Sequence, residues 1–337
     1  MENKPFGLGA VLTQDTRDFK YIAAAGLPEI LPITYKTDTS MFPVLMQASI
    51  PACVSHAWVR LMQIYWYKKT GKVINFSPRF LHALTSPGMG DSDGRDPRVV
   101  GNALISVGCC TEATLPNDTS LDSHTYTRVP ITAAMLDEAK QYKIPAYSFI
   151  NIDQYSIRHA IYHKGAVAFL FQIGKEWWTP SWSPADINPL RPPQVSVGGH
   201  EVTGEHWNTL EGIENSWSSA WDEQGYAEFN LNNYKPNQAI CIDDPTIDFN
   251  PTGVQKFKFM KDLSYGMTNL DVLQLQKRLN SIPGNQIALT GAGSPGNETT
   301  YFGVLTRNAV IKYQLAHGIT PPFGYVGIKT RTIMNLP

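Results

Sequence analysis

Cysteine is scarce in this sequence: 337 residues contain four, Cys53, Cys109, Cys110 and Cys241. So few thiols in so long a chain do not make a disulfide framework, and we expect the adjacent pair Cys109 and Cys110 to be core residues rather than a redox switch. The fold must therefore rest on buried apolar side chains. The length predicts two domains with ample material for a core.

Excess charge and long apolar runs are also missing. The 28 Lys and Arg residues balance 29 Asp and Glu residues, for a net charge of −1, which predicts neither a nucleic-acid partner nor an anionic membrane as partner. No apolar run has the length of a membrane span. Residues 1–7 lack the basic and then apolar pattern of a secretory signal, so we expect synthesis in the cytoplasm and export, if any, by another route.

Metal-binding patterns are incomplete. His159 and His163 have the spacing of zinc ligands on a helix, but Ala160 stands where the zinc-protease motif has glutamate. Residues 91–96 resemble part of a calcium loop, but Asn102 falls where a bidentate glutamate is needed. We therefore predict no metal and no cofactor.

The sequence does contain the residue types of a cysteine hydrolase. The thiol is Cys53, and it opens an apolar-periodic stretch, 54–67, that is followed by two lysines and by Gly71. That pattern predicts a helix with Cys53 at its N-terminus. A helix N-terminus carries partial positive charge, which favours thiolate.

Gln47, Cys53, His200 and Asn215 follow one another in an order and at spacings that resemble the papain family of cysteine peptidases. The resemblance implies an α+β, papain-like fold in which His200 activates Cys53. Asn215 would orient the imidazole through its side-chain carbonyl. Gln47 and the Cys53 backbone N–H would stabilise the oxyanion.

Further segments carry the same resemblance. Residues 215–226 are similar to the Asn-Ser-Trp signature of the family, and residues 76–81 to its next helix start. The resemblance implies that Trp217 shields the His–Asn hydrogen bond and that the backbone of Gly94 pairs with an extended substrate.

The chain departs from the family pattern around these residues. Ala48 and Pro51 replace glycines, Val54 replaces tryptophan, and Glu201 replaces a small apolar residue after the histidine. Ile50 stands where extracellular members have a disulfide-bonded cysteine. No inhibitory propeptide is recognisable. The changes bear on specificity, while the catalytic groups are all present.

Two further segments complete the catalytic unit. The apolar run 165–171 predicts a buried strand. Residues 175–199 are rich in proline and predict a loop beside the site. Its Trp177, Trp178 and Trp182 either pack against the domain or stack on sugar rings.

The last part of the chain differs in composition and contains a degenerate repeat. From residue 261 onward the chain has seven Lys or Arg residues and only three Asp or Glu residues. The segment 301–307 is echoed by 325–331, each opening a predicted helix, and apolar periodicity predicts another helix over 270–280. Three short helices make a small bundle. Its motifs resemble the peptidoglycan-binding domain of bacterial and phage cell-wall enzymes.

These observations predict three parts: a papain-like peptidase domain at 1–243, a linker at 244–262 and a peptidoglycan-binding-like domain at 263–337. The expected activity is amide hydrolysis at the bacterial envelope. Its substrate is a protein or the peptide of peptidoglycan, and the enzyme is a phage product carried in the virion or released by lysis, an endolysin in the second case. The alternative is a catalytically silent structural or adhesion protein, such as a phage tail component.

Overall fold

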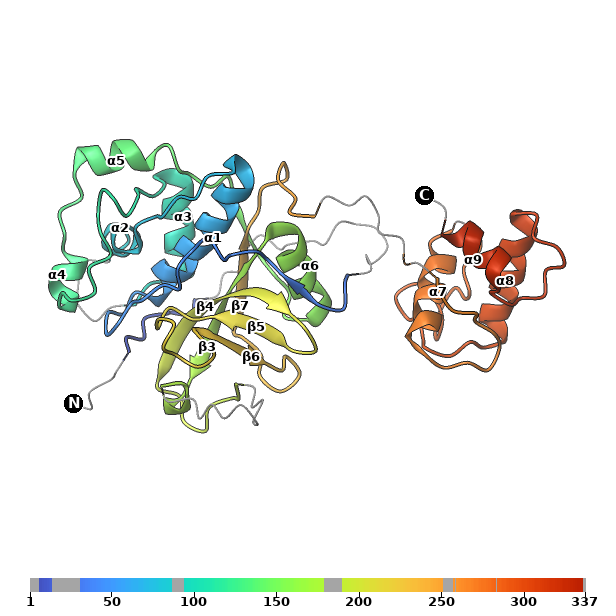
Figure 1. Ribbon diagram of the computed structural model, residues 1–337. Helices are drawn as coiled ribbons and strands as arrows, with labels where there is room; N and C mark the ends of the chain where they lie inside the picture. Colours follow the sequence, from blue (N-terminus) through green and yellow to red (C-terminus); the bar gives the residue numbers. More distant parts are fainter. Residues whose placement is uncertain are drawn as a thin grey trace. The chain divides into compact units, whose positions relative to one another are not determined.

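The computed structural model describes residues 6–13, 31–86, 94–178, 190–250, 257, 259–282 and 284–335. These divide into two compact units, one with the described residues up to 250 and one with those from 257 onward (Figure 1). The domain limits predicted above remain predictions. Asp244 and Asp248, which lie in the predicted linker, form hydrogen bonds with Tyr65 and His163 of the first unit.

Five helices gather in one part of the first unit (Figure 1). The longest is the predicted helix around Cys53, which begins one residue before the predicted stretch and ends at Gly71, where φ is 69°. Short polar caps start the others: Ser77, Asp96, Asp122 and Thr132 each accept a bond from a backbone N–H of the first turn. The helices are α1 (Cys53–Thr70), α2 (Pro78–Leu84), α3 (Pro97–Ser106), α4 (Ser123–Thr127) and α5 (Ala133–Ala139).

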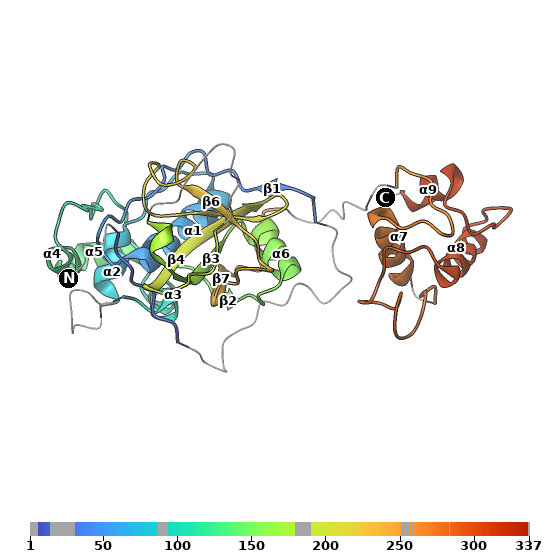
Figure 2. The ribbon, with the colours of Figure 1, turned by 90° about the horizontal axis from the view of Figure 1, so that it is seen from below.

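The rest of the first unit is an antiparallel sheet with order β2-β7-β3-β4-β5-β6, and β1 pairs with β4 beside that path. α6 (Gln154–Lys164) packs on the sheet, and both views keep it apart from α2–α5 (Figures 1 and 2). The strands are β1 (Tyr35–Lys36), β2 (Tyr147–Phe149), β3 (Val167–Ile173), β4 (Gly198–Trp207), β5 (Glu211–Glu214), β6 (Tyr226–Phe229) and β7 (Gln238–Ile242).

The strand predicted at 165–171 is confirmed as β3, shifted by two residues. The shift has a local cause, because Gly165, at φ 86°, ends α6 and cannot also begin the strand. In the predicted loop, Lys175–Trp177 form a short 3-10 turn and Trp182 lies outside the described residues. Trp177 is fully buried against the domain, so packing is the correct alternative for this tryptophan.

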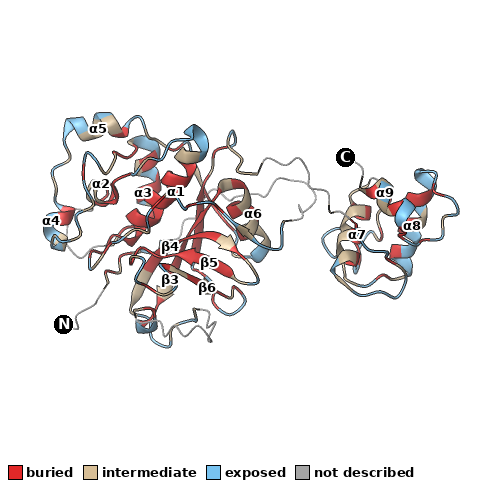
Figure 3. Cartoon of the chain, viewed as in Figure 1, coloured by how far each residue is buried: buried red, intermediate tan, exposed pale blue. Residues whose placement is uncertain are grey.

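The first unit has two main apolar cores, one around α1–α3 and one between the sheet and α6. Figure 3 shows buried residues along α1, β4 and β7. Cys109 and Cys110 are fully buried in the first core, as predicted, and all four cysteines are free. α1 packs against β4 where the cores meet, and this junction holds the predicted catalytic residues.

The second unit contains α7 (Leu270–Asn280), α8 (Val304–Ala316) and α9 (Ile328–Met334), around an apolar core. The sequence repeat has a structural counterpart. Gln276 on α7 donates to the Tyr301 carbonyl and to the Thr306 hydroxyl. Gln314 on α8 donates in the same way to Tyr325 and Thr330, one repeat further on. Each glutamine fixes the turn that starts the next helix.

Within the described residues, no helix has both the length and the apolar character that a membrane crossing requires.

Candidate active site

Cys53 is the first residue of α1, and the first turn of that helix carries no acidic side chain that would cancel its positive end. The thiol is nevertheless fully buried. Burial raises the pKa of Cys53 to about 12, although backbone hydrogen bonds from Glu201 and Gly9 act in the opposite direction. In this structure the thiol is therefore neutral, in a setting that would favour thiolate once water reaches it.

His200 and Asn215 form a hydrogen-bonded pair. His200 lies on β4 and Asn215 directly follows β5, and the antiparallel register pairs Thr203 with Glu214, which brings them together. The His200 Nε2 atom lies 2.8 Å from the Asn215 Oδ1 atom. Because an amide oxygen only accepts, Nε2 carries the proton and Nδ1 is left as a base.

The other nitrogen of His200, Nδ1, has no hydrogen-bond partner among the described residues. The Glu201 backbone, next along β4, reaches the Cys53 thiol, so this part of β4 lies against the start of α1. Burial lowers the pKa of His200 to about 4, while the Asn215 bond raises it in part. The imidazole is therefore neutral here, as the thiol is.

Trp217 covers the imidazole. Its ring stacks on the His200 ring with centroids 4.6 Å apart. Phe6 stacks on Trp217, with centroids 4.4 Å apart and an interplanar angle of 7°. Trp217 is 1 % exposed, so water is kept from the His200–Asn215 bond on that side.

Gln47 is held in place by the residue after Asn215. The Ser216 hydroxyl donates to Gln47 Oε1 at 2.5 Å, and the Gln47 backbone N–H donates to the Ser216 carbonyl. Gln47 Nε2 donates to the carbonyl oxygens of Gly7 and Ile50, at 2.8 and 2.9 Å. Both amide hydrogens are thus occupied.

Ala48 follows Gln47 with φ 49°. This left-handed conformation suits the glycine of the family pattern and costs alanine about 1 kcal/mol. The strained turn persists because the bonds of Gln47 and Ser216 hold the backbone on both sides.

Gly94 and its neighbour Arg95 lie against residues 9–11, and the predicted pairing of the Gly94 backbone with a substrate stays a prediction. The Arg95 N–H donates to the Gly9 carbonyl at 2.6 Å, and the Arg95 carbonyl accepts from the Val11 N–H. A Cβ on Gly94 would lie 2.2 Å from the Gly9 oxygen. Gly94 therefore leaves room for an extended chain that pairs with Arg95.

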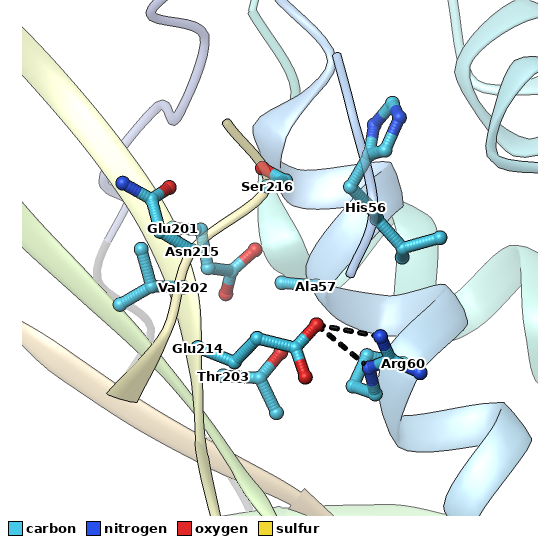
Figure 4. A pocket seen from close by; sticks show the side chains of 10 residues that line it. His56, Ala57, Arg60, Glu201, Val202, Thr203, Glu214, Asn215 and Ser216 are labelled. Atoms are coloured by element: carbon cyan, nitrogen blue, oxygen red, sulfur yellow. Dashed lines mark hydrogen bonds and ion pairs between the residues drawn. The ribbon is translucent and has the colours of Figure 1, made fainter. Parts of the chain in front are cut away.

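A small pocket lies behind these residues, between α1 and β4 (Figure 4). Figure 4 shows the Glu201 carboxyl pointing toward Ala57, while Arg60 and Glu214 form an ion pair at 2.6 Å. Neither Glu201 oxygen has a hydrogen-bond partner among the described residues. Burial holds the pKa of Glu201 well above its usual range, and Asp96 adds to the shift.

Two contributors to the site were missed by sequence reasoning. Ser216 orients Gln47 although 169 residues separate them, and the Arg95 backbone pairs with Gly9 and Val11. A signal existed for Ser216, since it stands inside the Asn-Ser-Trp segment. No sequence signal pointed to Arg95.

The two units resemble different known proteins. Residues 268–334 match a family model described as "Putative peptidoglycan binding domain". No curated protein sequence matches this chain.

Solved structures match the first unit. Xylellain, a cysteine protease from Xylella fastidiosa, is 20% identical, with TM-score 0.60 over 71% of this chain and 97% of that one. Procathepsin B S9 from Trypanosoma congolense is 13% identical, with TM-score 0.55 over 70% and 85% of the two chains. Digestive procathepsin L 3 from the larval midgut of Tenebrio molitor is 16% identical, with TM-score 0.52 over 70% and 75%. The first unit therefore has the α+β fold of papain-like cysteine proteases, and a peptidoglycan-binding-like helical unit follows it.

Proposed function

We propose that this protein is a cysteine peptidase that hydrolyses amide bonds at the bacterial cell envelope, with Cys53 as nucleophile. The observation that carries the proposal is the hydrogen bond from His200 Nε2 to Asn215, which leaves Nδ1 as a base on β4, the strand whose Glu201 backbone reaches the Cys53 thiol. The fold, shared with cysteine proteases, supports it.

The chemistry follows from these positions. His200 Nδ1 takes the thiol proton, and the sulfur attacks the amide carbonyl carbon to form a tetrahedral oxyanion. Gln47 Nε2 and the Cys53 backbone N–H donate to that oxygen. His200 then returns the proton to the departing amine. Water, deprotonated by the same nitrogen, attacks the thioester and releases the acid.

The substrate is proposed from the second unit. A module of the peptidoglycan-binding type would hold the enzyme on the wall, where it meets both the peptides of peptidoglycan and wall-attached proteins. We infer a phage product, an endolysin or a virion-associated enzyme, from this combination.

Incubation of the protein with casein and with purified sacculi, followed by identification of new amino termini, tests the proposal. New termini in either substrate, absent with Cys53→Ala, support a peptidase, and the substrate that yields them identifies its class. Binding to sacculi with no new termini in either substrate would favour the silent structural protein instead.

A further inference from the structure

The loop before α1 carries both proposed oxyanion donors, and two of its peptide groups are held by side chains that have no part in the mechanism above. The first peptide group joins Met46 to Gln47. Its N–H donates to the Ser216 carbonyl at 2.9 Å, and its carbonyl accepts from the Asn117 Nδ2 atom at 3.0 Å. The backbone at Gln47 is therefore held from opposite edges.

The second peptide group joins Ala52 to Cys53, and its N–H is the other proposed donor. Its carbonyl accepts two bonds from His56, one from the backbone N–H at 3.0 Å and one from the ring Nδ1 atom at 2.8 Å. The backbone bond belongs to the first turn of α1. No side chain caps this helix start, so the ring bond is an added restraint on the peptide group of Cys53.

One asparagine joins these two restraints. Because a carbonyl only accepts, His56 Nδ1 carries the proton and Nε2 is an acceptor. The Asn117 Nδ2 atom lies 3.3 Å from that Nε2 atom, and Asn117 Oδ1 accepts from the Tyr126 hydroxyl at 2.7 Å. Burial lowers the pKa of His56 to about 4, so the ring is neutral near pH 7 and Nε2 stays an acceptor.

The side chain of Asn117 is half-buried and fully engaged. Its two amide hydrogens and its Oδ1 atom each have a partner, so the side chain has one orientation. Apolar packing supports the same loop, because Ile50, Ala52 and Tyr126 are fully buried and form a small core of their own. The hydroxyl that fixes Asn117 thus belongs to a ring that packs beneath the loop.

We propose that Asn117 and His56 are positioning residues that hold the two oxyanion donors, the Gln47 amide and the Cys53 N–H, at a fixed separation. The oxyanion role rests on the proposed function; the network of bonds does not. Asn117 fixes the peptide group before Gln47, His56 fixes the one that contains the Cys53 N–H, and their mutual contact couples the two. Donors held in this way need no reorganisation when negative charge develops on the substrate oxygen.

Steady-state hydrolysis of a soluble peptide by the wild type, by Asn117→Ala, by Gln47→Ala and by the double variant tests the proposal. Asn117→Ala should lower kcat about tenfold and change KM little, because the donors are displaced while the substrate still binds. In the Gln47→Ala chain the same substitution should lower kcat only about threefold, since one of the two donors is already absent. Asn233→Ala, which changes an exposed asparagine in the turn after β6, is the matched control and should have the wild-type kcat.

Amide hydrogen exchange at residues 46–53, read by mass spectrometry, reports on the network whether or not the chain is active. Asn117→Ala should speed exchange there at least about fivefold, because the loop opens locally more often, and should leave exchange in β3 unchanged. If Asn117→Ala fails to fold, Tyr126→Phe, which removes only the hydroxyl that bonds to Asn117, replaces it in both measurements.

An equal fold-loss of kcat with and without the Gln47 side chain, or unchanged exchange at residues 46–53, would overturn the positioning role. Faster exchange in the variant, when the wild type hydrolyses neither casein nor sacculi nor the soluble peptide, would leave the network standing and remove the proposed function.

Discussion

At the residue scale, the side chain of Gln47 is held in one orientation by its neighbours. Its Oε1 is fixed by Ser216 and one amide hydrogen is fixed by Ile50, so the remaining hydrogen has a set direction. In this structure that hydrogen is donated to the Gly7 carbonyl oxygen. A substrate carbonyl in that place would receive the same bond without any reorganisation, which is the condition for strong oxyanion stabilisation.

Gln47→Ala should lower kcat by about 10²–10³ and change KM little, because the bond is made mainly in the transition state. The measurement is steady-state hydrolysis of a soluble peptide by the wild type and by the variant. Ser216→Ala should give a smaller fall in the same direction. A Gln47→Ala enzyme in which only KM changed would remove Gln47 from the oxyanion role.

Asn215 and His200 should differ in the size of their effects. Asn215→Ala removes only the acceptor that orients the ring, whereas His200→Ala removes the proton carrier, so activity should fall further in the second. Steady-state hydrolysis of the same soluble peptide by the two variants shows which one loses more activity. Full activity of Asn215→Ala would mean that the 2.8 Å bond has no catalytic part.

At the scale of the element, β4 carries the proposed catalytic histidine, His200, and two acids, Glu201 and Glu205. Alternation along the strand puts Glu201, Thr203 and Glu205 on the face opposite His200, toward α1. Arg60 on that helix pairs with Glu214 of β5. Burial raises the pKa of Glu205 to about 8, and Glu214 adds to the shift while Arg60 opposes it.

A raised pKa means that the folded protein holds this proton more tightly than the unfolded chain. The stabilisation is complete below the ordinary glutamate pKa of about 4.5 and is lost as the pH rises through about 8. Glu205→Gln keeps a neutral side chain and the acceptor for Thr39. Its thermal midpoint should therefore exceed that of the wild type above pH 8, by roughly 2–4 °C for each kcal/mol recovered, and match it near pH 4.

Thermal unfolding across that pH range, with the exposed Glu223→Gln as control, measures the difference. A midpoint difference that did not change with pH would mean that Glu205 is not the group that titrates.

The sequence was most informative about the elements. Apolar periodicity located α1, and the predicted helix 270–280 has the bounds of α7, because side chains three and four residues apart decide both. The proposed catalytic residues were selected because their types and order are unusual together, and their roles stay a prediction. The seat of residues 6–11 could not be predicted, since it depends on backbone contacts with Ala48, Arg95 and Gly199, which are remote in sequence.

At the scale of the molecule, we propose that the first unit hydrolyses the substrate and that the second unit binds the cell wall. A chain cut after Asn250 keeps the proposed catalytic groups and the bonds of Asp244 and Asp248 to the first unit. This shorter chain should hydrolyse a soluble peptide as the full chain does. It should lose about tenfold or more of the activity on sacculi or wall-attached protein, because tethering raises the effective concentration of the enzyme there.

Assays of the full chain and of the chain cut after Asn250, each on both substrates, give the comparison. Equal losses on the soluble and insoluble substrates would assign the second unit, residues 257–335, to assembly rather than to wall binding.

The proposed mechanism depends on Cys53, activated by His200, as the nucleophile. The site at which an epoxysuccinyl inhibitor attaches covalently to the folded protein, read by peptide mapping, tests this role. We expect an adduct on Cys53 that is lost in His200→Ala, with Cys109, Cys110 and Cys241 unmodified. Attachment to another cysteine, or equal attachment to Cys53 without His200, would contradict the mechanism.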